Sequence, residues 1–468
     1  MTIKEFHESL KNRKISAREM VATTFETIRA KNEQLHAYLE VFETDAFEAA
    51  RAIDERIASG ETPGALWGVP LAIKDNILIK GRHASAGSRI LENYVASYDA
   101  TVIDRLRRAG AIFIGRANMD EFAMGSSTEN SAYGPTHNPI HANYVPGGSS
   151  GGSAVAVAAH MALGALGSDT GGSIRQPAAF CGVVGLKPTY GAVSRSGVMA
   201  MASSLDQIGP FGKTVDDVET IYHAIRGHDI LDATSVPDAT HHVSTKEVKT
   251  IGVPKEYFID GLDPRIKASV EKMAEKLSAT YDIKEISLPH MKEALPCYYI
   301  IVPAEVSSNM ARYDGIRYGV RSGGETITEV YNNTRGEGIG KEVRRRILLG
   351  TYVLSHGYYD AYYAQAQKVR SLIKSDFTKA FQEVDIIIGP TTPTLPFKIG
   401  EKANDPLAMY LSDIYTIPVN LAGIPGLVVP GGTIPEDGVD FPVGIQLLSR
   451  HFGEEQLFEI GRMIEKVR

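Results

Sequence analysis

Helix-type and strand-type patterns of apolar residues alternate along most of the chain. They predict helices over about 16–31, 45–59, 101–109, 153–163 and 264–280, with a longer helical region over 298–370. Short apolar runs bounded by turn residues predict strands at about 68–74, 111–115, 182–188, 249–253, 283–288, 385–390, 426–430 and 442–447. This alternation is typical of α/β architecture.

Local signals add detail to this pattern. Ser16-Ala17-Arg18-Glu19 is a capping box, in which the serine and glutamate side chains bond free N–H groups at a helix start. The segment Thr214-Val215-Asp216-Asp217 is expected to open a further helix. The polar, turn-rich segment 227–247 is expected to lie on the surface. No internal repeat is evident.

Composition narrows the class of protein. A formal charge of −7 argues against a chain that grips nucleic acid by itself. Only Cys181 and Cys297 are present, so neither a disulfide framework nor a cysteine metal site is predicted. The first residues lack the apolar core of a signal peptide, and no apolar run approaches membrane-spanning length. We therefore expect a soluble, cytoplasmic protein without a metal.

One stretch, residues 146–177, carries the candidate chemistry. Glycine-serine clusters at 147–153 and 170–173 bracket the predicted helix over 153–163. Because glycine has no Cβ, N–H groups in such turns can converge on one point. Serines among converging donors suggest nucleophilic attack with stabilisation of the resulting oxyanion. A flexible linker would not be joined to an apolar helix and repeated on its far side.

Two other motifs compete for this stretch. A phosphate-binding loop would end in Gly-Lys-Ser/Thr, and the one such tripeptide, at 212–214, has Gln207 where the first glycine should be. The nucleophile elbow G-x-S-x-G is formally matched at 147–151. An elbow enzyme needs a histidine downstream, and His290, His356 and His451 have no distinctive context.

Ser173 is the better nucleophile candidate, because it follows Gly171 and Gly172. Asp169 and Arg175 could pair to brace its loop, or form an ordinary surface ion pair. Its base could be Lys74 acting through Ser149, since burial lowers a lysine pKa. Spacing alone favours a structural role for Lys74, either as a side chain that reaches out to solvent or in a core salt bridge with Asp75.

These residues resemble the amidase signature family. The matching segments are GGSSGGS at 147–153, GSDTGGSIRQP at 167–177 and the strand-terminal Lys74, within a resemblance that covers nearly the whole chain. It implies a large mixed β-sheet between α-helices, built as one domain over 1–468. Residues 1–60 would be scaffold, 61–220 the catalytic core, and 248–468 would complete the sheet and the substrate pocket.

The same resemblance assigns the catalytic roles. Lys74 is implied as base, Ser149 as relay after a cis peptide bond, and Ser173 as the nucleophile. The N–H groups of Thr170, Gly171, Gly172 and Ser173 are implied as the oxyanion hole.

Further segments, including 119–134, 307–319 and 417–426, resemble the family members that hydrolyse glutamine within tRNA-dependent amidotransferases. This implies that ammonia passes to a B subunit, which assembles with a small C subunit, for amidation of Glu-tRNA(Gln) or Asp-tRNA(Asn). ATP and Mg²⁺ would be used by the partner, which would also make most tRNA contacts. No cofactor is expected in this chain.

A glutamine pocket needs charges opposite the α-carboxylate and α-ammonium groups. The resemblance places Arg346 on the carboxylate, Asp413 on the ammonium, and Tyr298, Met124 and Ser126 beside the substrate. A guanidinium suits the carboxylate because its planar fork can bind two oxygens. A solvated Arg346 and a helix-capping Asp413 are the alternatives.

Three other functions stay open. A free-standing amidase would not need Arg346 and Asp413 in its pocket. A non-catalytic scaffold protein would keep the fold without activity, and an esterase would depend on a histidine.

Overall fold

A computed structural model describes residues 1–237, 247–258 and 260–468; the segment 238–246 of the predicted surface excursion lies outside them. Within the described residues, eleven strands form a single sheet. The strands are β1 (Tyr38–Val41), β2 (Pro70–Lys74), β3 (Ile112–Ala117), β4 (Gly164–Asp169), β5 (Val184–Lys187), β6 (Gln207–Gly212), β7 (Thr250–Pro254), β8 (Asp282–Ile286), β9 (Ile386–Pro390), β10 (Gly426–Glu436) and β11 (Val439–Ser449).

The sheet is mixed. Its order is β1-β3-β2-β4-β6-β5-β10-β11-β9-β7-β8. Strand β2 is parallel to both of its neighbours, β3 and β4. Strand β7 is likewise parallel to β8 and β9. The central strands from β4 to β9 pair antiparallel.

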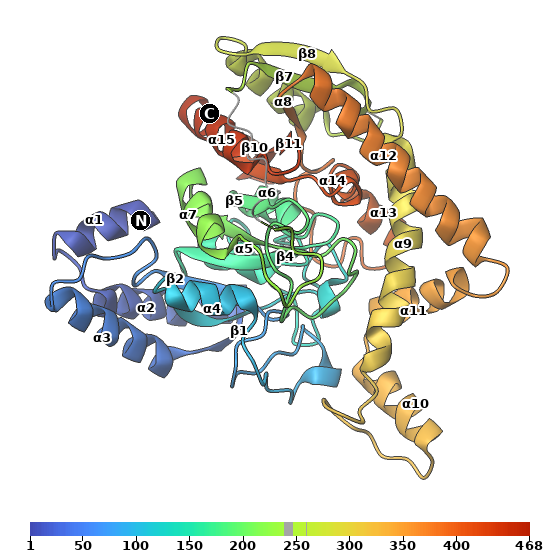
Figure 1. Ribbon diagram of the computed structural model, residues 1–468, viewed down its shortest axis with the longest axis horizontal. Coiled ribbons are helices and arrows are strands. Elements are labelled where there is room, and N and C mark those ends of the chain that lie inside the picture. Colours follow the sequence, from blue (N-terminus) through green and yellow to red (C-terminus); the bar gives the residue numbers. More distant parts are fainter. Residues whose placement is uncertain (238–246, 259) are drawn as a thin grey trace.

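Helices cover both faces of this sheet (Figure 1). They are α1 (Ile3–Lys11), α2 (Ala17–Leu35), α3 (Glu43–Ala58), α4 (Thr101–Arg108), α5 (Gly151–Ala158), α6 (Arg175–Cys181), α7 (Val215–Ile225), α8 (Pro264–Leu277), α9 (Ala294–Asn309), α10 (Ile327–Gly338), α11 (Lys341–Val353), α12 (Ala364–Glu383), α13 (Pro406–Leu411), α14 (Ile417–Ala422) and α15 (Glu454–Val467). Figure 1 places α1 to α3 at one end of the molecule and α9 to α12 at the other.

Alternation along the strands shows that both faces are buried. In β2, Leu71 and Ile73 join the core that includes residues of α4, α7 and α15, whereas Ala72 joins the core of α2, α3, α5 and α6. In β10, Leu427 likewise joins the first of these cores and Val428 joins the second. The predicted class, a large mixed sheet between helices, is confirmed. Among the described residues, none of the helices is both long and apolar enough to span a bilayer.

One predicted element is wrong in extent. The helix expected over 153–163 is α5, which begins at Gly151 and ends at Ala158. His160 takes a left-handed conformation with φ 62°, which breaks the helix. The Leu163 N–H then donates to the carbonyl of Pro70, at the start of β2, and the chain continues as β4.

Candidate active site

Two parallel strands bring the candidate base and nucleophile to one edge of the sheet. Lys74 is the last residue of β2, and Asp169 is the last residue of β4. Ser173 follows β4 by four residues. Because parallel neighbours end at the same edge, the β2 lysine faces the loop that carries Ser173. The N-terminus of α5, with Ser149 and Ser150 just before it, approaches the same place.

Lys74 is fully buried and held by serines. Its Nζ lies 2.8 Å from the Oγ atoms of both Ser149 and Ser150, and 2.9 Å from Ser168 Oγ. It also contacts the Ser168 carbonyl at 3.3 Å. No salt bridge joins Lys74 to Asp75 in the described chain; Asp75 instead pairs with Arg116 at 2.8 Å. The salt-bridge interpretation of Lys74 is therefore wrong.

Burial lowers the pKa of Lys74 to about 7, although the charges of Asp120, Asp169 and Asp206 raise it in part. A large fraction of the lysine is thus neutral near pH 7 and can accept a proton.

The hydrogen-bond pattern distinguishes the two neighbouring serines. Ser150 Oγ donates its own proton to the carbonyl of Ser168, at 3.1 Å. Within the described part of the chain, Ser149 Oγ has a hydrogen bond only with Lys74. Ser149 can therefore donate to a neutral lysine, as a relay requires, and its peptide bond with Gly148 is cis, as expected.

Ser173 lies at the surface of this buried centre, with 8% of its area exposed. Its carbonyl accepts a hydrogen bond from Ser150 N at 3.2 Å, which holds the two glycine-serine clusters together. Among the hydrogen bonds of the described residues, none joins Ser149 Oγ to Ser173 Oγ. The second link of the predicted relay is therefore not formed in this structure.

An internal ion pair braces the nucleophile loop. The Arg175 Nη2 and Nε atoms lie 3.0 and 3.1 Å from the two carboxylate oxygens of Asp169, and both side chains are fully buried. Asp169 also accepts from the N–H of Gly172 at 2.8 Å and of Ile174 at 3.1 Å. The pair is thus not a surface contact. It fixes the loop on both sides of Ser173.

This brace bears on the predicted oxyanion hole. Because the Gly172 N–H is directed at Asp169, it is already engaged. The N–H groups of Thr170, Gly171 and Ser173 donate to no described residue, so these three members of the predicted hole can bond a substrate oxygen without breaking a contact.

Sequence-distant residues meet beside this loop. Ser126 Oγ donates to Asp413 Oδ2, while Asp413 Oδ1 is buried without a hydrogen-bond partner in the described chain. Burial raises the pKa of Asp413 to about 7, against the opposing effect of the Ser126 hydrogen bond. An unpaired buried carboxylate oxygen is costly, so this atom is suited to a cationic ligand.

Arg346 is buried on α11. Its Nε donates to Glu342 at 2.8 Å, and its guanidinium carbon lies 5.5 Å and 5.6 Å from the ring centroids of Tyr299 and Tyr410. Arg346 lines a cavity of about 350 Å³ together with Gly125 and Ser127, the neighbours of Ser126. The solvated alternative for Arg346 is wrong, because only 4% of the residue is exposed.

Two contacts tie this pocket to the nucleophile loop. The Thr416 hydroxyl lies 2.6 Å from the carbonyl of Gly171 and 3.0 Å from that of Asp413. A Cβ added to Gly171 would lie 2.5 Å from the hydroxyl oxygen of Tyr298, so glycine is needed there. Met124 is buried in the same apolar cluster as Tyr298.

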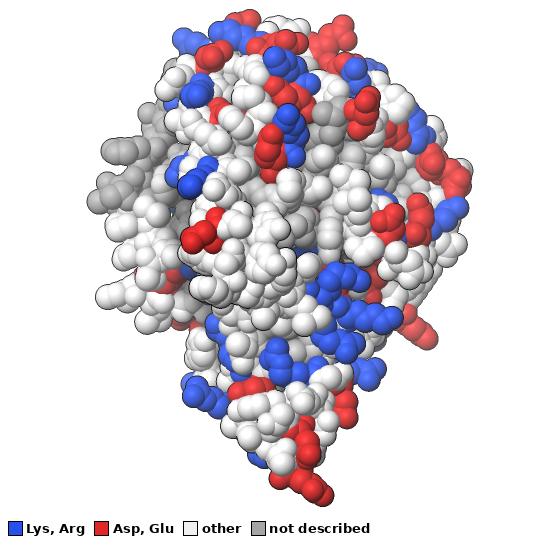
Figure 2. Space-filling view, turned by 90° about the vertical axis from the view of Figure 1, so that its right-hand side faces the viewer, with Lys and Arg blue, Asp and Glu red and all other residues white. Residues whose placement is uncertain are grey.

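Positively charged side chains cluster on the side of the molecule where the cavity beside Arg346 opens. Figure 2 shows the face that carries α9 to α12, with Lys and Arg side chains clustered on it. Lys341 and Arg345 of α11 are exposed and also line the 350 Å³ cavity. In a chain of net charge −7, such a local excess of positive charge attracts an anionic group.

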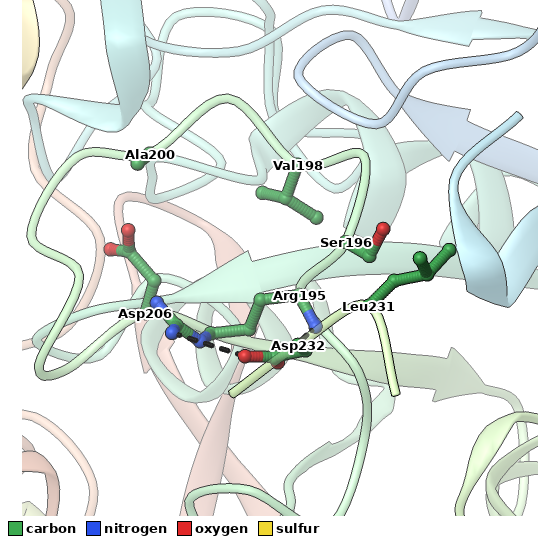
Figure 3. A pocket seen from close by; sticks show the side chains of 7 residues that line it. All are labelled: Arg195, Ser196, Val198, Ala200, Asp206, Leu231 and Asp232. Carbon is green, nitrogen blue, oxygen red and sulfur yellow. Dashed lines mark hydrogen bonds and ion pairs between the residues drawn. The ribbon is translucent and has the colours of Figure 1, made fainter. Parts of the chain in front are cut away.

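A smaller cavity of about 130 Å³ is lined by Asp206, which contacts the nucleophile loop (Figure 3). Arg195 and Asp232 form an ion pair on its wall, at 3.4 Å, and Asp206 also lines it. The Asp206 carboxylate accepts from Thr170 Oγ1 at 2.7 Å, so it holds the residue that begins the loop. Burial raises the pKa of Asp206 to about 6.

Sequence reasoning missed four residues that support this centre. Gln176 links the two loops, because its Oε1 accepts from Gly148 N and its Nε2 donates to the Ser126 carbonyl, both at 2.8 Å. Ser150, Ser168 and Asp206 are the other three. Ser150, Ser168 and Gln176 stand inside the quoted motifs, but nothing in their spacing indicates these contacts.

Comparison with known proteins places these features in a wider group. The amidase family model matches residues 19–458. The chain is 54% identical to the A subunit of the glutamyl-tRNA(Gln) amidotransferase of Carboxydothermus hydrogenoformans, covering 100% of this chain and 97% of the relative. The corresponding protein of Thermoanaerobacter pseudethanolicus is 52% identical, with 100% and 96% coverage.

Solved structures agree. The A subunit of the glutamyl-tRNA(Gln) amidotransferase of Thermotoga maritima is 40% identical, with a TM-score of 0.79 and coverage of 100% of this chain and 94% of that one. A solved amidase, 28% identical, matches with a TM-score of 0.83 over 100% of this chain and 99% of its own.

Proposed function

Because this chain belongs to the amidase signature family, we propose that it hydrolyses the side-chain amide of glutamine as the A subunit of a tRNA-dependent amidotransferase. One observation carries the choice of substrate. Asp413 and Arg346 are buried groups of opposite charge, and they lie close enough for the Arg346 charge to lower the pKa of Asp413 in part. They complement the ammonium and carboxylate groups of a free amino acid.

The catalytic residues have distinct roles in this proposal. Neutral Lys74 takes a proton from Ser149, which takes one from Ser173. Ser173 Oγ then attacks the side-chain carbonyl carbon, and the negative oxygen is stabilised by the free N–H groups of Thr170, Gly171 and Ser173. Formation of the ester requires a hydrogen bond from Ser173 Oγ to Ser149 Oγ. A small rotation of these two side chains therefore accompanies substrate binding.

The C–N bond breaks next. The leaving nitrogen receives a proton returned through Lys74 and Ser149, and departs as ammonia. Water then attacks the glutamyl ester, the same groups remove its proton, and Ser173 and glutamate are released. One glutamine and one water molecule thus give one glutamate and one ammonia.

The ammonia is used elsewhere in the assembly. The similar proteins are named as the A subunit of an amidotransferase. We propose a heterotrimer in the cytoplasm, in which a B subunit is joined by a small C subunit. The partner would bind ATP, Mg²⁺ and tRNA, which fits the acidic charge of this chain. Glu-tRNA(Gln), Asp-tRNA(Asn) or both would be the acceptor.

The test is ammonia release from glutamine, asparagine and propionamide, measured for the chain alone and in its complex. We expect a preference for glutamine that Ser173→Ala abolishes. Turnover of propionamide without glutamine would instead indicate a free-standing amidase. Activity that survives Ser173→Ala but depends on a histidine would indicate an esterase-type site, and no activity in the complete complex would indicate a scaffold protein.

A further inference from the structure

Glu121 connects two parts of the molecule that are distant in sequence. It is 3% exposed and begins the short helix η2 (Glu121–Ala123), just before Met124 and Ser126. Its Oε2 accepts a hydrogen bond from the backbone N–H of Gly340 at 2.8 Å, across 219 residues. Its Oε1 accepts from Ser88 Oγ. A buried carboxylate thus spans from the catalytic half to the second half of the chain.

The partner of Glu121 is the start of α11. Gly340 is the N-cap of this helix and has no side chain to cap it. A carboxylate beside a helix N-terminus interacts favourably with the helix dipole. The fit is close, because a Cβ on Gly340 would lie 2.2 Å from Glu121 Oε2. Glu121 therefore provides the cap that α11 lacks.

Helix α11 carries Arg346, six residues beyond Gly340. At 1.5 Å of rise per residue, Arg346 lies about 9 Å further along the helix axis. A shift of the helix start therefore moves the guanidinium, because the intervening turns are continuous. At the other end, the strained residues Phe122 and Ala123, with φ 48° and 63°, join Glu121 to the loop of Ser126.

We propose that Glu121 is a positioning residue for the substrate: it fixes the start of α11, and through it Arg346, at a set distance from the loop of Ser126 and Asp413. This inference rests on the proposed function, since it concerns how the carboxylate and ammonium sites are held apart. A free amino acid has one fixed separation between these two groups, so the spacing selects for it.

The experiment compares Glu121→Gln with Glu92→Gln in the full chain, assembled with its partners. Glu92 is an exposed acid near Ser88, so it is the matched control. A glutamine side chain has only one acceptor oxygen where Glu121 uses two, so it cannot accept from both the Gly340 N–H and Ser88 Oγ, and we expect Glu121→Gln to raise the KM for glutamine about tenfold. The control should not change, and turnover of propionamide should stay within about twofold.

A double-mutant cycle separates positioning from general damage. In an Arg346→Ala background, Glu121→Gln should raise the glutamine KM no further, because the group that it positions is gone. An equal rise in both backgrounds, or equal losses on glutamine and propionamide, would overturn the proposal. So would an unchanged KM.

A readout without substrate keeps the two proposals distinguishable. Amide hydrogen exchange at residues 340–344 should accelerate in Glu121→Gln, and unchanged exchange there would remove Glu121 as a cap of α11. This holds even if glutamine proves not to be the substrate. If Glu121→Gln does not fold, Ser88→Ala, which removes one donor to the same carboxylate, is expected to give the same pattern with a smaller amplitude.

Discussion

Ser150 lies as close to Lys74 as Ser149 does: each Oγ is 2.8 Å from Nζ. The difference lies in the direction of the protons. Ser150 donates to the Ser168 carbonyl, whereas Ser149 has no described acceptor other than the lysine. Distance alone would make either serine the relay, and the second hydrogen bond selects Ser149.

Replacing these two serines in turn should have unequal effects. Ser149→Ala removes the proton relay and is expected to lower kcat by roughly 10³-fold. Ser150→Ala removes an orienting contact, and we expect a loss of about tenfold. Steady-state ammonia release measures both. Equal losses would mean that the relay does not run through Ser149 alone.

The activity should rise with pH through about 7. Lys74 must be neutral to act as the base, and burial lowers its pKa to about 7. We therefore expect kcat/KM to rise about tenfold per pH unit below 7 and to level off above it.

Propionamide is the substrate for this measurement, because it lacks the ammonium group that Asp413 would bind. The titration of Asp413, whose pKa also lies at about 7, then has no ligand to act on. A profile that is flat from pH 5.5 to 9 would exclude Lys74 as the base.

Arg346 should not tolerate lysine. Arg346→Lys keeps the charge but loses the planar fork, so we expect the glutamine KM to rise by about tenfold with little change for propionamide. Arg344→Lys is the matched control, since Arg344 lies on the same helix but is exposed and does not line the cavity. Similar effects of both substitutions would show that Arg346 does not bind the glutamine carboxylate.

The Asp169–Arg175 pair is expected to dominate local stability. Arg175→Ala leaves a buried carboxylate unpaired and should lower the free energy of unfolding by about 3–5 kcal/mol. Removing the exposed pair of Arg108 with Asp104, by Arg108→Ala, should cost less than about 1 kcal/mol. Urea unfolding at pH 7 measures both. If Arg175→Ala lowered the free energy of unfolding by less than Arg108→Ala does, the pair would not brace the loop.

This pair also predicts the response to acid. Burial alone would raise the pKa of Asp169, but Arg175 outweighs it and lowers the value from 3.8 to about 2. The folded state then binds its proton less readily than the unfolded state does. The stabilisation of the folded state by ionised Asp169 is therefore complete above pH 3.8, and it is lost as the pH falls from 3.8 to about 2.

Much of the fold could be predicted from local patterns. The capping box at Ser16 and Glu19 opens α2, and Thr214 opens α7. Strand β2 ends at Lys74 as the apolar run indicates. These features are determined by residues that are adjacent in sequence, so a local pattern can predict them. Helix α1 is absent from the prediction, although Thr2 and Glu5 form the same kind of box.

Other features depend on contacts that no local pattern contains. Strand β4, GALGSD, is poor in residues that favour strands, and it is extended because β2 and β6 pair with it on both sides. The contact of Ser126 with Asp413 spans 287 residues. The family resemblance placed both residues at the substrate, but only the folded chain shows that they touch.

The order of the site residues along the chain has a consequence for divergence within such a fold. Lys74, Ser149 and Ser173 all come from strands and loops before β5, whereas Tyr298, Arg346 and Asp413 come from the segment between β8 and β10. The proposed reacting groups are therefore encoded in one block of the gene, and most of the proposed recognition groups, Ser126 and Met124 excepted, in another. Selection can alter the second block and change which amide is accepted, while the bond-breaking apparatus is inherited intact.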